Sequence, residues 1–178
     1  MKAGGGKSKG SSFERDIARY LTKWLTGQDK ELYFWRSPSS GAVATINEMN
    51  GDISGDIIAL KTEAKCLVDM FSIELKCGYK DADLSKHLKK TKNNTIKSFW
   101  DQCIRDSRMA NGKYGMLIFK KDREPTIVGI EKDTIMEKLM SNKIKNTITL
   151  SYKDLPSVVF YDFIDFFDTL KPEQLKGI

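Results

Sequence analysis

Two short stretches of the chain decide its fold: Gly55-Asp56-Ile57-Ile58-Ala59-Leu60 and Met70-Phe71-Ser72-Ile73-Glu74-Leu75-Lys76. Each is a largely apolar run of the length of one strand, and a turn is expected between them. Alternate side chains of a strand point to opposite faces of its sheet. In the second stretch one face therefore carries Phe71, Ile73 and Leu75, and the other carries Ser72, Glu74 and Lys76.

The charged residues of these strands allow two interpretations. A carboxylate and an ammonium two residues apart on one strand face, as in Glu74 and Lys76, can hold a metal ion and a water side by side. The same pair is also common as an ordinary ion pair on a half-exposed strand. Asp56 opens an otherwise apolar strand, as a side chain does where a sheet end meets a site, but a turn aspartate that ends the preceding loop looks the same.

Hydrophobic periodicity predicts the elements around these strands. Residues 13–26 show the i, i+4, i+7, i+8 spacing of an amphipathic helix, which Gly27 ends. We expect further strands at 32–36, 114–120, 126–131 and 147–152, and helices at 96–110, 134–140 and 160–170. This order predicts an α/β fold with a mixed central β-sheet flanked by helices. We expect a flexible basic arm at 1–10 and a single domain at 11–178.

Composition narrows the class of protein. The chain has 178 residues, of which 40% are hydrophobic and 30% charged, so we expect a folded domain and not a disordered polycation. No apolar run approaches the roughly 18 residues of a membrane span, which predicts a cytoplasmic protein without a membrane partner. Three cysteines without a CxxC pair and a single histidine argue against a disulfide scaffold and a zinc site. An essential metal should then be Mg²⁺ or Mn²⁺ held by oxygen.

The positive charge of the chain is concentrated in one region. The formal net charge is +6, and residues 76–97 alone hold seven lysines against two aspartates. A clustered positive region favours a polyanionic partner, because binding releases condensed counterions. A solvated lysine-rich loop is the alternative that charge alone leaves open.

Glu14 also has two interpretations. At 100° per residue it falls between Leu21 and Leu25 on the flank of the buried stripe of the first helix, and so could turn toward the strands. Ser11 and Glu14 also fit the Ser-x-x-Glu capping box, in which the glutamate only satisfies a backbone amide.

Taken together, these residues resemble a known family. Asp56, followed by Glu74-Leu75-Lys76 and preceded by a helix with a glutamate, resembles the PD-(D/E)XK nuclease superfamily. The wider pattern resembles its Holliday-junction-resolvase-like and phage-encoded branch: Phe13-Glu14, Arg36, Ser40-Gly41, Gly55-Asp56-Ile57 and Ile73-Glu74-Leu75-Lys76. The resemblance covers residues 10–120. It departs from the signature in one place, where Gly55 replaces the proline before Asp56.

The resemblance implies a restriction-endonuclease-like core and a set of site residues. Glu14, Asp56 and Glu74, with the backbone carbonyl of Leu75, would ligate Mg²⁺ or Mn²⁺, and Lys76 would orient or deprotonate the attacking water. Gln102 matches a glutamine found beside this core, although helical phasing places it away from the predicted inner face. That face consists of Ile96, Phe99, Trp100, Cys103, Ile104 and Ser107. The residues expected to contact DNA phosphates are Arg36, Ser40, Lys86, Lys89, Lys90 and Lys92.

The resulting hypothesis is a metal-dependent DNA endonuclease, with branched DNA as one candidate substrate and a homodimer as the arrangement that two symmetric nicks would need. An end-processing or restriction-type nuclease would use the same residues. A catalytically silent nucleic-acid-binding module with the same fold is the alternative from another class.

Overall fold

The computed structural model describes residues 5–37, 55–85, 94–110, 113–140 and 144–176. In chain order the helices and strands are α1 (Gly5–Thr26), β1 (Phe34–Arg36), β2 (Ile57–Ala59), η1 (Thr62–Ala64), α2 (Lys65–Val68), β3 (Phe71–Cys77), α3 (Thr95–Met109), β4 (Tyr114–Lys120), β5 (Thr126–Glu131), α4 (Thr134–Met140), β6 (Ile148–Leu150), β7 (Val158–Asp162), α5 (Phe163–Thr169) and η3 (Pro172–Leu175).

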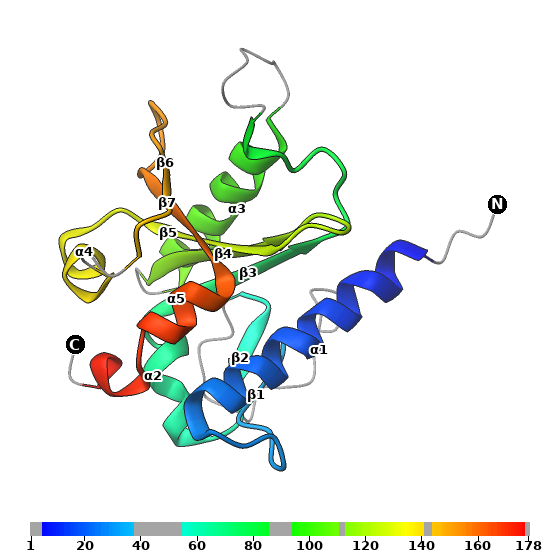
Figure 1. Ribbon diagram of the computed structural model, residues 1–178, viewed down its shortest axis with the longest axis vertical. Coiled ribbons are helices and arrows are strands. Elements are labelled where there is room, and N and C mark those ends of the chain that lie inside the picture. Colours follow the sequence, from blue (N-terminus) through cyan, green and yellow to red (C-terminus); the bar gives the residue numbers. More distant parts are fainter. Residues whose placement is uncertain (1–4, 38–54, 86–93, 111–112, 141–143, 177–178) are drawn as a thin grey trace.

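A five-stranded sheet forms the centre of the molecule, in the order β3-β4-β5-β7-β6. β3 and β4 are parallel and are connected through α3, whereas the remaining pairs are antiparallel. β1 and β2 form a separate antiparallel pair, and a bridge from Gly55 to Ile73 brings this pair to the free edge of β3. The predicted α/β fold with a mixed sheet flanked by helices is confirmed (Figure 1).

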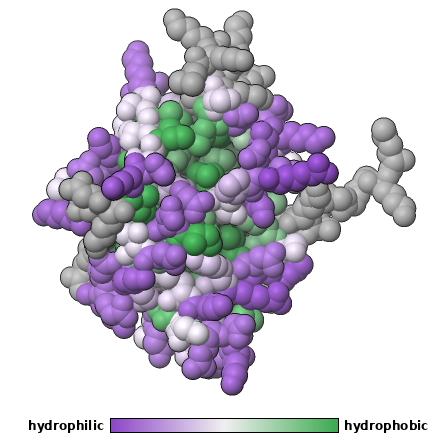
Figure 2. All heavy atoms as spheres, viewed as in Figure 1, coloured by the Kyte–Doolittle hydropathy of each residue, from purple (hydrophilic) through white to green (hydrophobic). Residues whose placement is uncertain are grey.

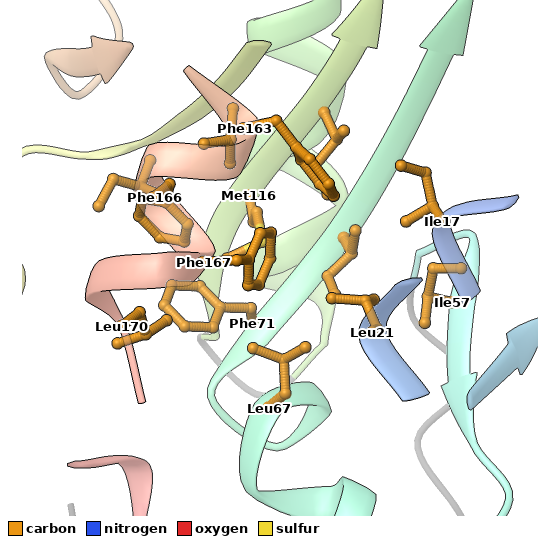
Figure 3. Packing of buried hydrophobic residues seen from close by; sticks show 14 of the residues in the cluster. Ile17, Leu21, Ile57, Leu67, Phe71, Met116, Phe163, Phe166, Phe167 and Leu170 are labelled. Carbon is orange, nitrogen blue, oxygen red and sulfur yellow. The ribbon is translucent and has the colours of Figure 1, made fainter. Parts of the chain in front are cut away.

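Helices cover both faces of this sheet. In β4, alternate side chains point to the helices on one face and to those on the other. Met116 and Ile118 pack in one cluster with residues of α1, α2 and α5, whereas Leu117 and Phe119 pack in a second cluster with α3. This is the alternation expected of a strand buried on both faces. Figure 3 shows the first cluster, in which side chains from α1, α2, β2 to β4 and α5 converge.

Two boundaries differ from the predicted ones. α1 begins at Gly5, so residues 5–10, expected in a flexible arm, belong to the helix. Glycine disfavours a helix, but extending a helix already formed costs less than starting one. The predicted helix at 160–170 is wrong in its first turn, because Val158–Asp162 form β7 and α5 begins at Phe163. Asp162 caps α5 by accepting hydrogen bonds from the amides of Ile164 and Asp165.

α1 is fixed against its neighbours by two polar contacts. The hydroxyl of Thr22, which is fully buried, donates to the carbonyl of Ala18 and accepts from the amides of Tyr33 and Phe34 at the start of β1. Trp24 Nε1 donates to the carbonyl of Leu170, 2.8 Å away, after the end of α5. α1 thus holds both the β1–β2 pair and the C-terminal helix.

The face of the molecule drawn in Figure 2 is mostly polar. Figure 2 shows hydrophilic side chains over most of one face, with hydrophobic ones in smaller patches between them. Within the described ranges, no helix combines the length and apolar character needed to cross a membrane.

Candidate active site

Gly55 and Asp56 lie against the free edge of β3. The amide of Asp56 donates to the carbonyl of Ile73 at 2.7 Å. Gly55 has a φ of +82°, and a Cβ built on it would lie 2.5 Å from the carbonyl oxygen of Ile73. Only glycine has the backbone freedom and the small size for this position. The close contact of the Gly55 backbone with Ile73 therefore fixes the position of Asp56 beside β3.

The Asp56 carboxylate turns toward β3 as well. Its Oδ2 accepts a hydrogen bond of 2.8 Å from the amide of Leu75. Burial raises the pKa of the Asp56 carboxyl to about 7, with the negative charge of Glu74 as the second cause, although the Leu75 amide acts in the opposite direction. Asp56 is thus a desolvated acid within electrostatic range of a second acid.

Glu74, Lys76 and Gln102 form a closed triangle of hydrogen bonds. Lys76 Nζ donates to Glu74 Oε1 and, at 3.1 Å, to Gln102 Oε1. Gln102 Nε2 donates to the same Oε1 of Glu74 at 2.9 Å. The side chains of Lys76 and Glu74 are only 15% and 8% exposed, so little water screens this ion pair. The pair is therefore an integral part of the site and not a half-exposed surface contact.

The charges of this triangle perturb one another. Burial is the main cause that raises the pKa of Glu74, although the hydrogen bond from Lys76 lowers it. Burial alone would lower the pKa of Lys76, but the hydrogen bond and the charge of Glu74, with the charge of Asp56, outweigh it and leave this pKa raised. Lys76 therefore stays a cation, which favours charge stabilisation or orientation of a reactant over the role of a general base.

Gln102 shows where helical phasing falls short. All six residues of the predicted inner face of α3 are buried, so the phasing of the helix itself is correct. Gln102 lies on the flank of that face, three residues after Phe99, and its long side chain still reaches β3. Helical phasing locates only the Cα atom, whereas the Gln102 side chain is long enough to bring its amide within 2.9 Å of Glu74 Oε1.

Glu14 and Arg36 form a second group beside these residues. Arg36 Nη1 donates to Glu14 Oε2 at 3.2 Å and to Ser11 Oγ at 3.0 Å. The charge of Glu14 contributes to the raised pKa of both Asp56 and Glu74, so Glu14 lies within electrostatic range of both acids. Because α1 begins at Gly5, Ser11 and Glu14 lie inside the helix, and the capping-box interpretation is wrong.

The described residues have the donor chemistry for a hard cation without forming a complete cage. In these parts of the chain, no group of three or more His, Cys, Asp or Glu side chains is close enough to hold a metal ion. Asp56 and Glu74 do supply carboxylate oxygens, the ligands that Mg²⁺ and Mn²⁺ prefer. Burial is the main cause of their raised pKa values and the negative charge of neighbouring acids is a further one, and a divalent cation would compensate that charge. The residues present therefore fit such an ion, with Glu14 held by Arg36.

The predicted DNA contacts are only partly described. Arg36 lies beside Glu14. Ser40, Lys86, Lys89, Lys90 and Lys92 lie outside the described residues. Two residues of α3 were not among the predicted site residues. They are Phe99, expected only in the inner face of the helix, whose ring centroid is 5.7 Å from Lys76 Nζ, and Asp106, whose charge contributes to the raised pKa of Glu74. With Gln102 they follow the i, i+3, i+7 spacing of one helix flank, and this spacing is the signal that could have found them.

Comparisons with known proteins agree with the resemblance and extend it. A family described as "Phage putative PDDEXK endonuclease" matches residues 5–177. Protein D14 of Escherichia phage T5 is 30% identical over 159 residues, which cover 86% of this chain and 86% of that protein. No solved structure matches the chain. The similarity thus includes residues 121–177, which the resemblance in sequence motifs did not cover.

Proposed function

Because this chain belongs to the phage PDDEXK endonuclease family, we propose that it is a metal-dependent deoxyribonuclease that hydrolyses phosphodiester bonds at the Asp56–Glu74–Lys76 site. One observation carries the proposal. Buried Glu74 and partly buried Asp56, both with raised pKa values, lie next to the partly buried Lys76, which keeps its proton. Keeping these charges away from water has an electrostatic cost, and such costs are concentrated at functional sites.

In this proposal Asp56 and Glu74 hold Mg²⁺ or Mn²⁺, with the Leu75 carbonyl and Glu14 as further ligands. The chemistry that such a cation supplies is polarisation of the scissile phosphate and a lower pKa for a coordinated water. Lys76 stabilises the negative charge that develops on the phosphoryl oxygens. Gln102 is a positioning residue, because it hydrogen-bonds both Lys76 and Glu74 and so fixes their separation.

The DNA partner is proposed from charge. The residues that would contact backbone phosphates, and so orient a substrate without reading its sequence, are Arg36, Ser40, Lys86, Lys89, Lys90 and Lys92. Junction-resolving activity would require two copies of the site and hence a homodimer. The same residues in a single copy would also support end processing or restriction-type cleavage.

A cleavage assay tests the proposal. The full chain is incubated with four-way junction, flap, duplex and single-stranded DNA in Mg²⁺, Mn²⁺ or EDTA. We expect cleavage only with a divalent cation, and a loss of about a hundredfold or more for Glu74→Gln and for Lys76→Ala. Glu74→Gln removes a carboxylate that would hold the cation, and Lys76→Ala removes the positive charge that would stabilise the phosphoryl oxygens. Glu137→Gln on α4, whose side chain is 59% exposed, is the matched control and should cleave normally.

A binding measurement accompanies the assay. Mn²⁺ should raise the thermal unfolding midpoint of the unsubstituted chain and raise it less in Glu74→Gln. Cleavage that persists in EDTA, or in both site variants, would overturn the mechanism. Binding of DNA without cleavage of any substrate would instead support the silent nucleic-acid-binding module.

A further inference from the structure

Tyr79 is an exposed aromatic residue directly after the strand that carries Glu74 and Lys76. Its relative exposure is 48%, one of the highest among the large hydrophobic residues of the described ranges. The turn that carries it is fixed: the amide of Gly78 donates to the carbonyl of Lys120, and the carbonyl of Tyr79 accepts from the amide of Ala82. Ala82 is itself buried. Tyr79 is therefore exposed at a defined place.

Two ring contacts connect Tyr79 to the candidate active site. The centroid of its ring is 4.8 Å from that of Phe99. Phe99 in turn contacts Lys76, whose Nζ lies 5.7 Å from the centroid of the Phe99 ring. Phe99 is only 7% exposed, so it is a fixed support between the lysine and the tyrosine.

The geometry of the ring pair leaves aromatic surface available on Tyr79. The two rings meet at 69°, an edge-to-face contact. When the Tyr79 ring presents its edge to Phe99, both faces of the Tyr79 ring are left uncovered by Phe99. When the Phe99 ring presents its edge to Tyr79, Phe99 covers one face of the Tyr79 ring. In either case Phe99 leaves at least one face of Tyr79 uncovered.

Exposed lysines lie near Tyr79, in a turn that also carries Asp81 and Asp83, of which Asp83 is paired with Lys121. Lys80 follows Tyr79 in the sequence. Lys120 lies at the end of β4, opposite Cys77 of β3. Both lysines are exposed. Positive charge that follows a nucleic-acid backbone, combined with an exposed aromatic ring, is the combination by which proteins bind single strands.

We propose that Tyr79 is a stacking platform for an unpaired nucleobase next to the phosphate held at Lys76. The inference rests on the proposed function and specifies its substrate class: DNA with unpaired nucleotides beside the scissile bond. A base pair in the interior of a duplex has both faces covered by its neighbours, so away from duplex ends only an unpaired or displaced base can stack on Tyr79.

The test measures binding in EDTA, so that it needs no cleavage. Single-stranded oligonucleotides with 2-aminopurine at successive positions are titrated with the chain, and fluorescence and anisotropy are recorded alongside a blunt duplex. Tyr79→Leu keeps an apolar contact with Phe99 but removes the aromatic face. We expect it to weaken single-strand binding by about fivefold to a hundredfold, with loss of 2-aminopurine quenching, and to leave duplex binding nearly unchanged.

Two controls make the result decisive. Tyr79→Phe keeps the ring and should keep both the affinity and the quenching. Ile148→Ala removes a side chain of similar exposure, 47%, on β6 at the other edge of the sheet, and should have no effect.

The proposal is overturned if Tyr79→Leu binds single strands as the unsubstituted chain does. It is also overturned if the variant loses affinity for single strand and duplex by the same factor. Failure of the proposed function would appear separately, as the absence of metal-dependent cleavage by the unsubstituted chain.

Discussion

At the scale of single residues, Gly55 accounts for the one departure from the family signature. A proline has its φ locked near −65°, whereas Gly55 has a φ of +82°. The same position also leaves no room for a Cβ against Ile73. The glycine before Asp56 is thus a steric requirement of this backbone and not a loss of the signature.

We predict that Gly55→Ala destabilises the chain more than Gly27→Ala. Both glycines have positive φ values, but a Cβ on Gly27 would meet nothing within 4 Å. Gly27→Ala should cost only the conformational strain, about 1 kcal/mol, and Gly55→Ala should add the clash with Ile73. Denaturant unfolding measures both, and equal losses would contradict the close approach of Gly55. Mn²⁺-induced stabilisation should also fall in Gly55→Ala alone, because the clash displaces Asp56.

The raised pKa of Asp56 predicts a pH dependence of stability. This pKa is about 7 in the folded chain and near 3.8 when unfolded, so the folded state binds the proton more tightly. The contribution of Asp56 to stability is therefore complete below about pH 4 and is lost as the pH rises toward 7. In EDTA, Asp56→Asn should show a smaller loss of stability between pH 5 and pH 8 than the unsubstituted chain. Urea unfolding at the two pH values measures this.

Asp165→Asn, at an exposed position on α5, is the matched control for that prediction. It should retain the pH dependence of the unsubstituted chain. If Asp56→Asn also retains the full dependence, Asp56 is not the group responsible.

At the scale of elements, periodicity predicted the strands and helices that position the site. The predicted inner face of α3 matches the observed burial. In β3, by contrast, the residues from Phe71 to Leu75 are buried on both faces of the strand, so Ser72 and Glu74 are buried although they are polar. The boundaries that were predicted wrongly are those where a local sequence pattern fits more than one structure. The spacing of aromatic residues after Phe160 resembles a helix, but Asp162 caps α5 and ends β7. Ser11 and Glu14 resemble a helix start but lie well inside α1.

The candidate site was predictable only as far as it lies on regular elements. Asp56, Glu74 and Lys76 could be singled out because β3 alternates and its neighbour begins with an acid. The contact of Glu14 with Arg36 could not, because it depends on how α1 packs against β1. Ser40 and the four predicted lysines of the 86–92 stretch lie outside the described residues, so their proposed DNA contacts remain predictions.

The packing of α1 against β1 rests on Thr22, and this predicts the effect of Thr22→Val. The substitution keeps the shape but leaves the amides of Tyr33 and Phe34 without their buried acceptor. We expect a loss of about 1–3 kcal/mol in the free energy of unfolding. Thr26→Val, at a more exposed hydroxyl of the same helix, should cost less. Equal costs in denaturant unfolding would show that the buried hydrogen bonds contribute little.

At the scale of the whole molecule, the C-terminal third completes the core that supports the site. Phe163 and Phe167 of α5 contact Tyr20 of α1, and Phe167 also contacts Trp24. The family match across residues 5–177 agrees with this arrangement, because the core could not be closed without α5.

Phe167→Ala should therefore destabilise the entire molecule. Phe167 is fully buried, and a phenylalanine replaced by alanine in such a place costs about 3–5 kcal/mol. Ile164→Ala, on the same helix but 48% exposed, should cost far less. Thermal unfolding of both variants measures the difference. A small effect of Phe167→Ala would show that α5 is a dispensable attachment.

The Leu75 amide, which donates a hydrogen bond to Asp56 Oδ2, can serve as an NMR probe of the site. The chemical shift of that one backbone amide should follow the charge of the carboxylate that it contacts. It should change as Asp56 gains a proton, and again as a cation displaces that proton. A single resonance in an NMR titration would then report the electrostatic state of the site in a chain with no substitution and no substrate.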